Sequence, residues 1–148
     1  MATPRAVRNN NPGNLESGPR WKGLLPASRR TPVQRREIRF AVFRSPEWGF
    51  RALALVLRNY QRRHGLDTVR RVVRRFAPPP ENETEGYIRA VARRMGIAAD
   101  VPLDLDSARV LMALCKAIAI QESGGWFFSD ADLAAGVALA LPPPPAIT

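Results

Sequence analysis

The sequence predicts a mainly α-helical protein with a small β element. From residue 46 onward, apolar residues recur at helical spacing, and most of these segments begin with Ser, Thr or Asp and end with Gly or Pro. Ile38, Phe40 and Val42 instead alternate with residues of other types, which is typical of a half-buried strand. We therefore expect a β-hairpin within residues 15–44, followed only by helices.

Two helices are predicted in the middle of the chain. The first begins at Ser45-Pro46-Glu47, which combines a cap, a first-turn proline and an early acid, and it ends at Gly65. Its apolar stripe comprises Leu53, Val56, Leu57 and Tyr60. A short second helix ends at the prolines 78–80. Its apolar face comprises Val69, Val72, Val73 and Phe76, and its other face comprises Arg70, Arg71, Arg74 and Arg75.

Three more helices are expected in the second half. The third is capped by Thr84 and stops at Gly96, and its inward residues are Tyr87, Ile88, Val91 and Met95. The fourth is capped by Asp106 or Ser107, and its stripe is Val110, Leu111, Leu114 and Ile118. The last begins near Ser129 and ends at the prolines 142–145. We expect one domain over residues 1–148, with 1–6 and 142–148 as loose tails.

Cysteine and histidine are too scarce for several kinds of site. The 148 residues include one Cys, Cys115, and one His, His64, so an internal disulfide and a structural zinc site are excluded. We predict no metal and no cofactor, with Cys115 as a small core residue and His64 solvated at a helix end. No apolar run reaches the roughly 18 residues of a transmembrane helix, and we expect no secretory signal.

Positive charge is concentrated in the first two-thirds of the chain. Residues 1–94 carry 20 arginines and Lys22 against seven acidic residues, whereas residues 95–148 carry two basic residues against six acidic ones. One interpretation is a polyanionic partner, such as nucleic acid, the bacterial envelope or a phospholipid surface. The other is a solvated arginine face. Both interpretations also apply to the Arg-rich face of residues 58–75, whose partner would be lipopolysaccharide or anionic lipid.

Glu122 is the main candidate for catalysis. It follows Ile118 by one helical turn, on the apolar stripe and at the C-terminal end of the fourth predicted helix. Apolar surroundings and the negative end of a helix dipole both disfavour the charged form of a carboxylate. A carboxylic acid that keeps its proton near neutral pH is what a general acid needs to break a glycosidic bond. The alternative is a glutamate at a fraying helix end that faces solvent or pairs with an arginine.

The segment Ala-Ile-Gln-Glu-Ser-Gly-Gly-Trp, residues 119–126, resembles the active-site helix of lysozyme-like peptidoglycan hydrolases. In both the lytic transglycosylases and the bacterial glucosaminidases, a helix ends in Glu-Ser-Gly and its glutamate is the catalytic acid. The resemblance implies the same role for Glu122.

Two further segments resemble the glucosaminidases. Asn14-Leu15, the Trp-Lys-Gly of residues 21–23 and the segment 41–47 are similar to the part of that family that leads through a β-hairpin into the next helix. Thr84 to Tyr87 is similar to the start of its tyrosine-bearing helix. In that family the glutamate helix comes first, whereas here it comes last. The resemblance therefore implies a lysozyme-like domain that is circularly permuted, which is tolerated when chain termini lie close together.

The N-terminal motif Arg-Asn-x-Asn-Pro-Gly-Asn, residues 8–14, resembles that of a family of small bacteriophage proteins with virion or lysis-related roles. This resemblance extends over residues 6–140.

Further site residues follow from these resemblances and from side-chain chemistry. The amides of Asn11 and Asn14 can bind the N-acetyl groups of a glycan, or close the loop as Asx turns. Trp21 and Trp126 can stack on sugars or fill the core. Tyr87 orients the sugar or packs inside, and Asn82, beside Glu81, rims the cleft or starts a helix. For a second catalytic carboxylate, Glu37 is the first candidate and Glu16 the next.

We therefore expect a phage-type endolysin or virion-associated muralytic enzyme, with peptidoglycan as partner and Glu122 as general acid. A hydrolytic and a transglycosylase mechanism both remain open. Such a protein would be a monomer made in the host cytoplasm, and it would reach the wall after release or in the virion. The alternatives are a non-catalytic phage structural or assembly protein, and a basic nucleic-acid-binding module. Against the last, the basic residues lack interleaved aromatics, and we expect no specific nucleic acid partner.

Overall fold

In a computed structural model of the chain, residues 2–143 are described, and they form seven α-helices and one 3-10 helix. The prediction of a mainly α protein is therefore confirmed. The elements in chain order are α1 (Arg5–Arg8), η1 (Ala27–Arg29), α2 (Pro32–Arg35), α3 (Pro46–His64), α4 (Val69–Phe76), α5 (Thr84–Met95), α6 (Ala108–Ser123) and α7 (Asp130–Ala140). Among residues 2–143, none of the helices combines the length and apolarity needed to span a bilayer.

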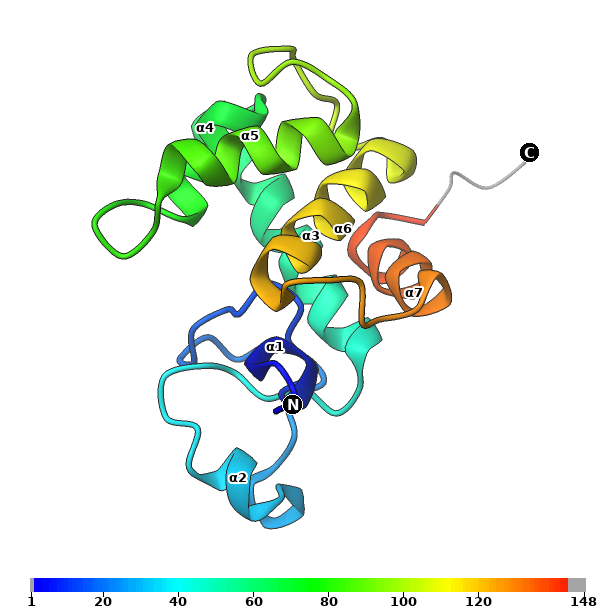
Figure 1. Cartoon of the computed structure of the whole chain (residues 1–148). Helices are drawn as coiled ribbons and strands as arrows, with labels where there is room; N and C mark the ends of the chain where they lie inside the picture. The colour runs from blue at the N-terminus through cyan, green and yellow to red at the C-terminus, as the bar shows by residue number, and fades with distance from the viewer. Residues whose placement is uncertain (1, 144–148) are drawn as a thin grey trace, which may run out of the picture.

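Helices α3 and α6 form the centre of the molecule. Helix α6 packs against α1, α3, α5 and α7, and α3 packs along α7. In Figure 1, α4 and α5 lie on one side of this pair and α7 on the other, while the first 45 residues form a largely irregular region that includes α1 and α2.

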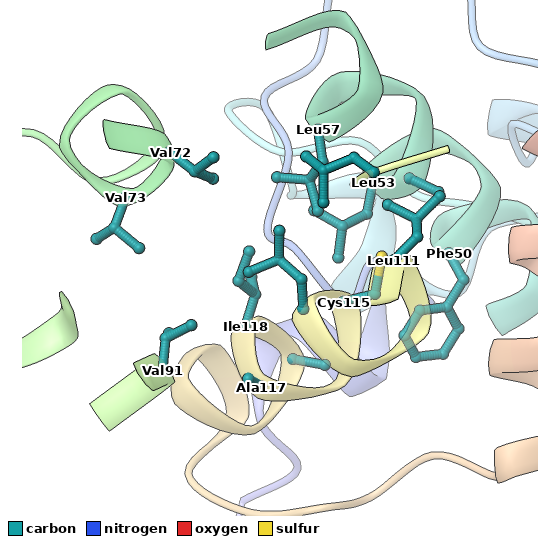
Figure 2. Packing of buried hydrophobic residues seen from close by; sticks show 14 of the residues in the cluster. Phe50, Leu53, Leu57, Val72, Val73, Val91, Leu111, Cys115, Ala117 and Ile118 are labelled. Carbon is teal, nitrogen blue, oxygen red and sulfur yellow. The ribbon is translucent and has the colours of Figure 1, made fainter. Parts of the chain in front are cut away.

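The core joins these two helices through large apolar side chains. Phe50, Leu53 and Leu57 of α3 and Leu111 and Ile118 of α6 are completely buried and meet in one cluster (Figure 2). Burying one such side chain contributes about 1.5–3 kcal/mol. Helix α6 is thus held along its length, and its last turn is a firm support for the residues that it carries.

The helix ends follow the expected signals closely. Gly65, Gly96 and Gly124 end α3, α5 and α6 in the left-handed conformation, with φ of 63°, 70° and 78°. Ser107 and Ser129 cap α6 and α7, because their hydroxyls accept hydrogen bonds from backbone N–H groups of the first turn. Local sequence therefore determines where these helices begin and end.

Two predicted caps act differently. Thr84 lies inside α5, and its hydroxyl donates to the carbonyl of Ala77 at 2.8 Å, so it ties α5 to the end of α4. Ser45 precedes α3, but its hydroxyl donates to Oε1 of Glu47 rather than accepting from the helix backbone. Both residues lie at the start of a helix, as the sequence predicts, but their side chains make other contacts than the predicted cap hydrogen bonds.

The predicted β-hairpin is wrong for the described residues. Two isolated antiparallel bridges, Glu16–Phe40 and Leu24–Phe43, replace it, and the intervening chain forms η1 and α2. The segment 38–44 bonds to two different stretches, since Ala41 N–H donates to the Leu15 carbonyl and Leu25 N–H to the Val42 carbonyl. Because this segment is covered on both sides, buried and exposed residues do not alternate along it. Three consecutive residues, 41–43, are buried, and Ile38 is exposed.

The expected N-terminal tail is shorter than predicted. Helix α1 begins at Arg5, and Ala6 is completely buried, because this helix packs against α6. Of the expected C-terminal tail, residues 142 and 143 carry no regular structure, and residues 144–148 lie outside the described residues.

Candidate functional site

Glu122 lies in the last turn of α6 and is half-buried. Each carboxylate oxygen accepts one hydrogen bond: Oε1 from Asn14 Nδ2 at 2.9 Å and Oε2 from Tyr87 Oη at 2.8 Å. The two donors come from the N-terminal loop and from α5, which are far from α6 in sequence. The structure thus brings together the three segments on which the resemblance to the hydrolases depends.

Asn14 is aimed at Glu122 by an unusual backbone conformation. Its φ is 46°, in the left-handed region that asparagine tolerates better than most residues. The backbone N–H of Asn14 donates to the Asn11 carbonyl at 2.9 Å, which closes a tight turn. Its side-chain Oδ1 is buried and lacks a hydrogen-bond partner within residues 2–143.

Asn11, the second predicted sugar-binding amide, serves the loop instead. It is completely buried, and its Nδ2 donates to the carbonyls of Leu15 and Ala41 at 3.0 and 2.9 Å. Its Oδ1 accepts from the Leu15 N–H at 2.9 Å. The expectation of substrate binding by Asn11 is therefore wrong, because two of these contacts close the N-terminal loop at Leu15 and the third ties it to Ala41.

Tyr87 is buried on α5 and points its hydroxyl at Glu122. Burial and, after it, the neighbouring Glu122 carboxylate raise the pKa of the Tyr87 hydroxyl well above its ordinary value. The hydroxyl therefore stays protonated through the neutral range and acts as a donor. This placement makes Tyr87 a residue that positions the glutamate.

A groove runs past Glu122 on both sides. One hollow has a volume of about 800 Å³, and a second has about 540 Å³; Glu81, Asn82 and Glu122 line both, so Glu122 borders each of them. The larger hollow is also lined by Asn14, Trp21, Phe40, Tyr60 and Phe76. Tyr87 and Gln121 line the smaller one.

Two other predicted residues, Trp21 and Asn82, lie in this groove. The indole N–H of Trp21 is buried and lacks an acceptor in the described part of the chain. Asn82 donates to the Pro78 carbonyl at 3.3 Å, at the rim formed by the connection between α4 and α5. With Asn14, the groove wall therefore contains one acceptor and one donor that are buried without a partner among residues 2–143.

Trp126 lies away from the groove, so its predicted stacking on a sugar is wrong. Its ring centroid is 6.1 Å from those of both Phe50 and Phe128, and the ammonium of Lys116 lies 4.7 Å from the indole. Trp126, which follows the Glu-Ser-Gly-Gly segment, therefore packs against Phe50 of α3 and Phe128, where this aromatic cluster covers the core.

Glu37 is also displaced from its predicted role. Its side chain is 11% exposed and faces Arg5 and Arg8, with N···O distances of 3.3 and 3.7 Å, and it accepts from Asn9 at 2.9 Å. It does not line either hollow. Glu37 therefore anchors α1 and is not a second catalytic carboxylate.

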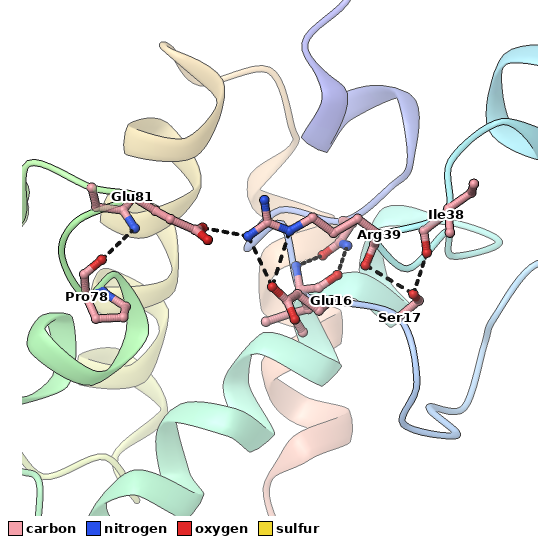
Figure 3. Close-up of polar contacts among 9 residues, drawn as sticks. Glu16, Ser17, Ile38, Arg39, Pro78 and Glu81 are labelled. Carbon is pink, nitrogen blue, oxygen red and sulfur yellow. Dashed lines mark hydrogen bonds and ion pairs between the residues drawn. The ribbon is translucent and has the colours of Figure 1, made fainter.

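Arg39 and Glu81 form a bridge in the groove that sequence reasoning missed. Arg39 Nη2 lies 3.2 Å from Glu16 Oε1 and 2.6 Å from Glu81 Oε2, as Figure 3 shows. All three residues line the larger hollow, but Glu81 belongs to the α4–α5 connection and the others to the N-terminal region. The arginine thus links two walls of the groove, and no local pattern signals this contact.

Fold and site together define a mainly helical protein in which the end of a central helix presents a glutamate to a polar groove. No family model matches the chain. The chain is 35% identical over 109 residues to Protein P5 of Pseudoalteromonas phage PM2, a match that covers 68% of this chain and 61% of that protein. The chain therefore spans less than two-thirds of this relative. The expected relationship to bacteriophage proteins is confirmed, and the name of the relative states no activity.

Proposed function

We propose that this phage-related protein is a muralytic enzyme that cleaves glycosidic bonds in the glycan strands of bacterial peptidoglycan. The observation that carries the proposal is the position of Glu122, which lines two neighbouring hollows of about 800 and 540 Å³. A polymer that occupies both hollows would pass over this carboxyl group. A bond at the middle of the bound segment would then be the one cleaved.

The hydrogen bonds of Glu122 determine which oxygen would carry the catalytic proton. An amide N–H₂ group can only donate, so Oε1 must remain an acceptor toward Asn14. A hydroxyl can both donate and accept, so Tyr87 can accept from a proton on Oε2. The protonated form of Glu122 therefore carries its proton on Oε2. From there the proton passes to the leaving oxygen as the bond between the sugar carbon and that oxygen breaks.

The placement of the two predicted partner carboxylates is compatible with a mechanism with one carboxyl group, although Glu81 and Glu83 also line the smaller hollow. Glu37 lies outside it, and Glu16 is paired with Arg39, so neither predicted partner faces Glu122 as a free carboxylate. After protonating the leaving group, Glu122 can act as the base and remove a proton from a hydroxyl of the same sugar. That oxygen then attacks the reacting carbon and forms an anhydro ring without consuming water, as in the lytic transglycosylases that the chain resembles.

The free polar atoms of the groove suit an N-acetylated sugar. The N–H of an acetamido group can donate to Oδ1 of Asn14, and its carbonyl can accept from the indole N–H of Trp21. Both atoms lack a protein partner among residues 2–143 but are buried in the groove wall, so a sugar reaches them only when the side chains of Asn14 and Trp21 move. The three segments that meet at Glu122 also support the circularly permuted lysozyme-like arrangement. Delivery to the wall, after release or in the virion, belongs to this proposal.

The test compares the protein with Glu122→Gln on purified sacculi. We expect soluble glycan fragments from the native chain, with anhydro ends in their mass spectra, and a loss of at least about a thousandfold in rate for Glu122→Gln, which cannot supply the proton. Glu85→Gln is the matched control, because Glu85 lies exposed on α5 and away from both hollows. Circular dichroism and thermal unfolding check that each variant folds.

Three results decide between the alternatives. Equal rates for Glu122→Gln and the native chain would contradict the proposal. New reducing ends in place of anhydro ends would retain the enzyme but replace the one-carboxyl mechanism with attack by water. A folded protein that releases no fragments and retains no affinity for sacculi would favour a structural or assembly role.

A further inference from the structure

The positive face predicted over residues 58–75 is partly neutralised by acidic neighbours. Arg70 lies 2.9 Å from Asp100 and 3.2 Å from Glu85, and Arg74 lies 3.3 Å from the same glutamate. Arg58 is buried and pairs with Asp106 at 2.9 Å. This face therefore offers less attraction to a polyanion than its composition indicates.

A denser group of arginines without ion pairs lies in the N-terminal region. We name residues 26–38 the arginine lobe, which contains η1 and α2. Its four arginines make no ion pair with any carboxylate of residues 2–143; they are Arg29, Arg30, Arg35 and Arg36. The one acidic residue of the lobe, Glu37, faces Arg5 and Arg8 outside it. Arg29, Arg35 and Arg36 are exposed and Arg30 is half-buried, so the lobe presents most of its positive charge to solvent.

The same lobe exposes two aliphatic side chains. Ile38 is 85% exposed and Val33 is 42% exposed, and they are among the few large apolar residues on the described surface. Aliphatic side chains in water are unfavourable, and beside four arginines they form a surface that is both cationic and apolar.

The lobe is held in place and projects from the helices. Gln34 is buried and donates to the Arg8 carbonyl at 2.8 Å, which fastens α2 to α1. Thr31 and Gln34 form a reciprocal capping box at the start of α2. Figure 1 shows α2 at the edge of the molecule, on the side away from α4 and α5.

We propose that the arginine lobe docks on a phospholipid bilayer with anionic headgroups. Each arginine near such a surface raises the binding constant about fivefold. An aliphatic side chain raises it further by entering the boundary between headgroups and acyl chains. Charge alone would also suit nucleic acid, but Ile38 and Val33 add nothing to binding of a phosphate backbone. The combination therefore favours lipid. This inference uses residues outside the groove and does not depend on Glu122.

The test measures co-sedimentation with vesicles at about 0.1 M salt. One set contains phosphatidylglycerol with phosphatidylethanolamine, and the other contains phosphatidylcholine alone. We expect binding to the anionic set, and a loss of at least about tenfold when Arg29, Arg30, Arg35 and Arg36 are all replaced by Gln. A separate variant, Ile38→Ser, should lose about threefold on the same vesicles.

The matched control replaces four other exposed arginines by Gln and so carries the same net charge; they are Arg62, Arg63, Arg93 and Arg109. It should bind the anionic vesicles within about twofold of the native chain. An equal loss in both fourfold variants would overturn the proposal in favour of net charge alone. Absence of binding by the native chain, or full binding by Ile38→Ser, would contradict it as well. If the lobe variant loses affinity for duplex DNA while vesicle binding is unchanged, the lobe is a nucleic-acid surface instead.

Discussion

The hydroxyl of Tyr87 donates a 2.8 Å hydrogen bond to Oε2 of Glu122 and so joins α5 to the end of α6. Asn14 donates to the other oxygen of the same carboxylate from the N-terminal loop. Three parts of the fold therefore converge on one side chain. This convergence locates the candidate site and leads to several tests.

Replacing Tyr87 by Phe should reduce the proposed activity and leave the fold intact. The ring still fills its place in the core, but the bond that holds Oε2 of the protonated acid is lost, and a hydrogen bond between uncharged groups contributes about 0.5–1.5 kcal/mol. We expect turnover on sacculi to fall by roughly 2- to 10-fold with little change in KM. Unchanged turnover, together with an unchanged pH–rate profile, would show that the tyrosine only packs.

Stability should decrease at alkaline pH because of the same residue. The pKa of Tyr87 is raised by burial and by Glu122, whereas in the unfolded chain it is near 10. Between these two values the folded protein keeps a proton that the unfolded chain has lost. The free energy of unfolding is therefore at its full value below about pH 10 and falls as pH rises further. Urea unfolding at pH 8, 10 and 11 should show this decrease in the free energy of unfolding, and the decrease should be smaller in Tyr87→Phe. Burial also raises the pKa of Tyr60, so Tyr60 accounts for part of the pH dependence that remains in the variant.

Asn11→Ala should destabilise the fold, in contrast to Asn14→Ala. Asn11 makes three buried hydrogen bonds to the backbone of Leu15 and Ala41, and its loss leaves these groups unpaired. We expect a decrease of at least about 2 kcal/mol in the free energy of unfolding, measured in urea. Compared with Asn11→Ala, Asn14→Ala should lower the free energy of unfolding less and reduce the activity on sacculi more. A stable but inactive Asn11→Ala would restore a role in binding to that residue.

The bridge between Arg39, Glu16 and Glu81 should oppose substrate binding. A glycan strand in the larger hollow has to displace this contact, which joins two walls of the groove. Because exposed ion pairs are screened by water and contribute little, we expect Arg39→Gln to lower KM by about threefold without affecting the melting temperature. Raising the salt concentration should lower KM in the native protein more than in Arg39→Gln. A KM that rises instead would show that the guanidinium binds the strand.

Cys115 should resist modification in the folded protein. It is completely buried on α6, and burial raises the pKa of its thiol, so little thiolate forms at pH 8. We expect an aromatic disulfide reagent to label it slowly in buffer and rapidly in denaturant. The labelling rate should follow unfolding, and it should increase in Asn11→Ala. Rapid labelling in buffer would indicate that α6 opens locally.

Much of the helical structure could be predicted from sequence, because the signals are local. Gly65, Gly96 and Gly124 end their helices since glycine adopts a positive φ at little cost, and Ser107 and Ser129 bond within one turn of themselves. Periodicity also identified the buried faces of α3 and α6. Glu122 could be selected for the same reason, because its place on the apolar stripe depends only on residues of its own helix.

The site around Glu122 was decided by the tertiary structure. The sequence correctly places four residues at the groove: Asn14, Trp21, Asn82 and Tyr87. It also selects three residues that the fold uses elsewhere. Asn11 closes the N-terminal loop, Glu37 anchors α1, and Trp126 belongs to the aromatic cluster with Phe50 and Phe128. The same residue types fit both uses, and only the surroundings distinguish them. The hydrogen bond between Asn14 and Glu122 joins residues that lie 108 positions apart in the sequence, and the bridge from Arg39 to Glu81 joins residues 42 positions apart. Helical spacing and capping act over a few residues, so contacts at such separations depend on how the core packs.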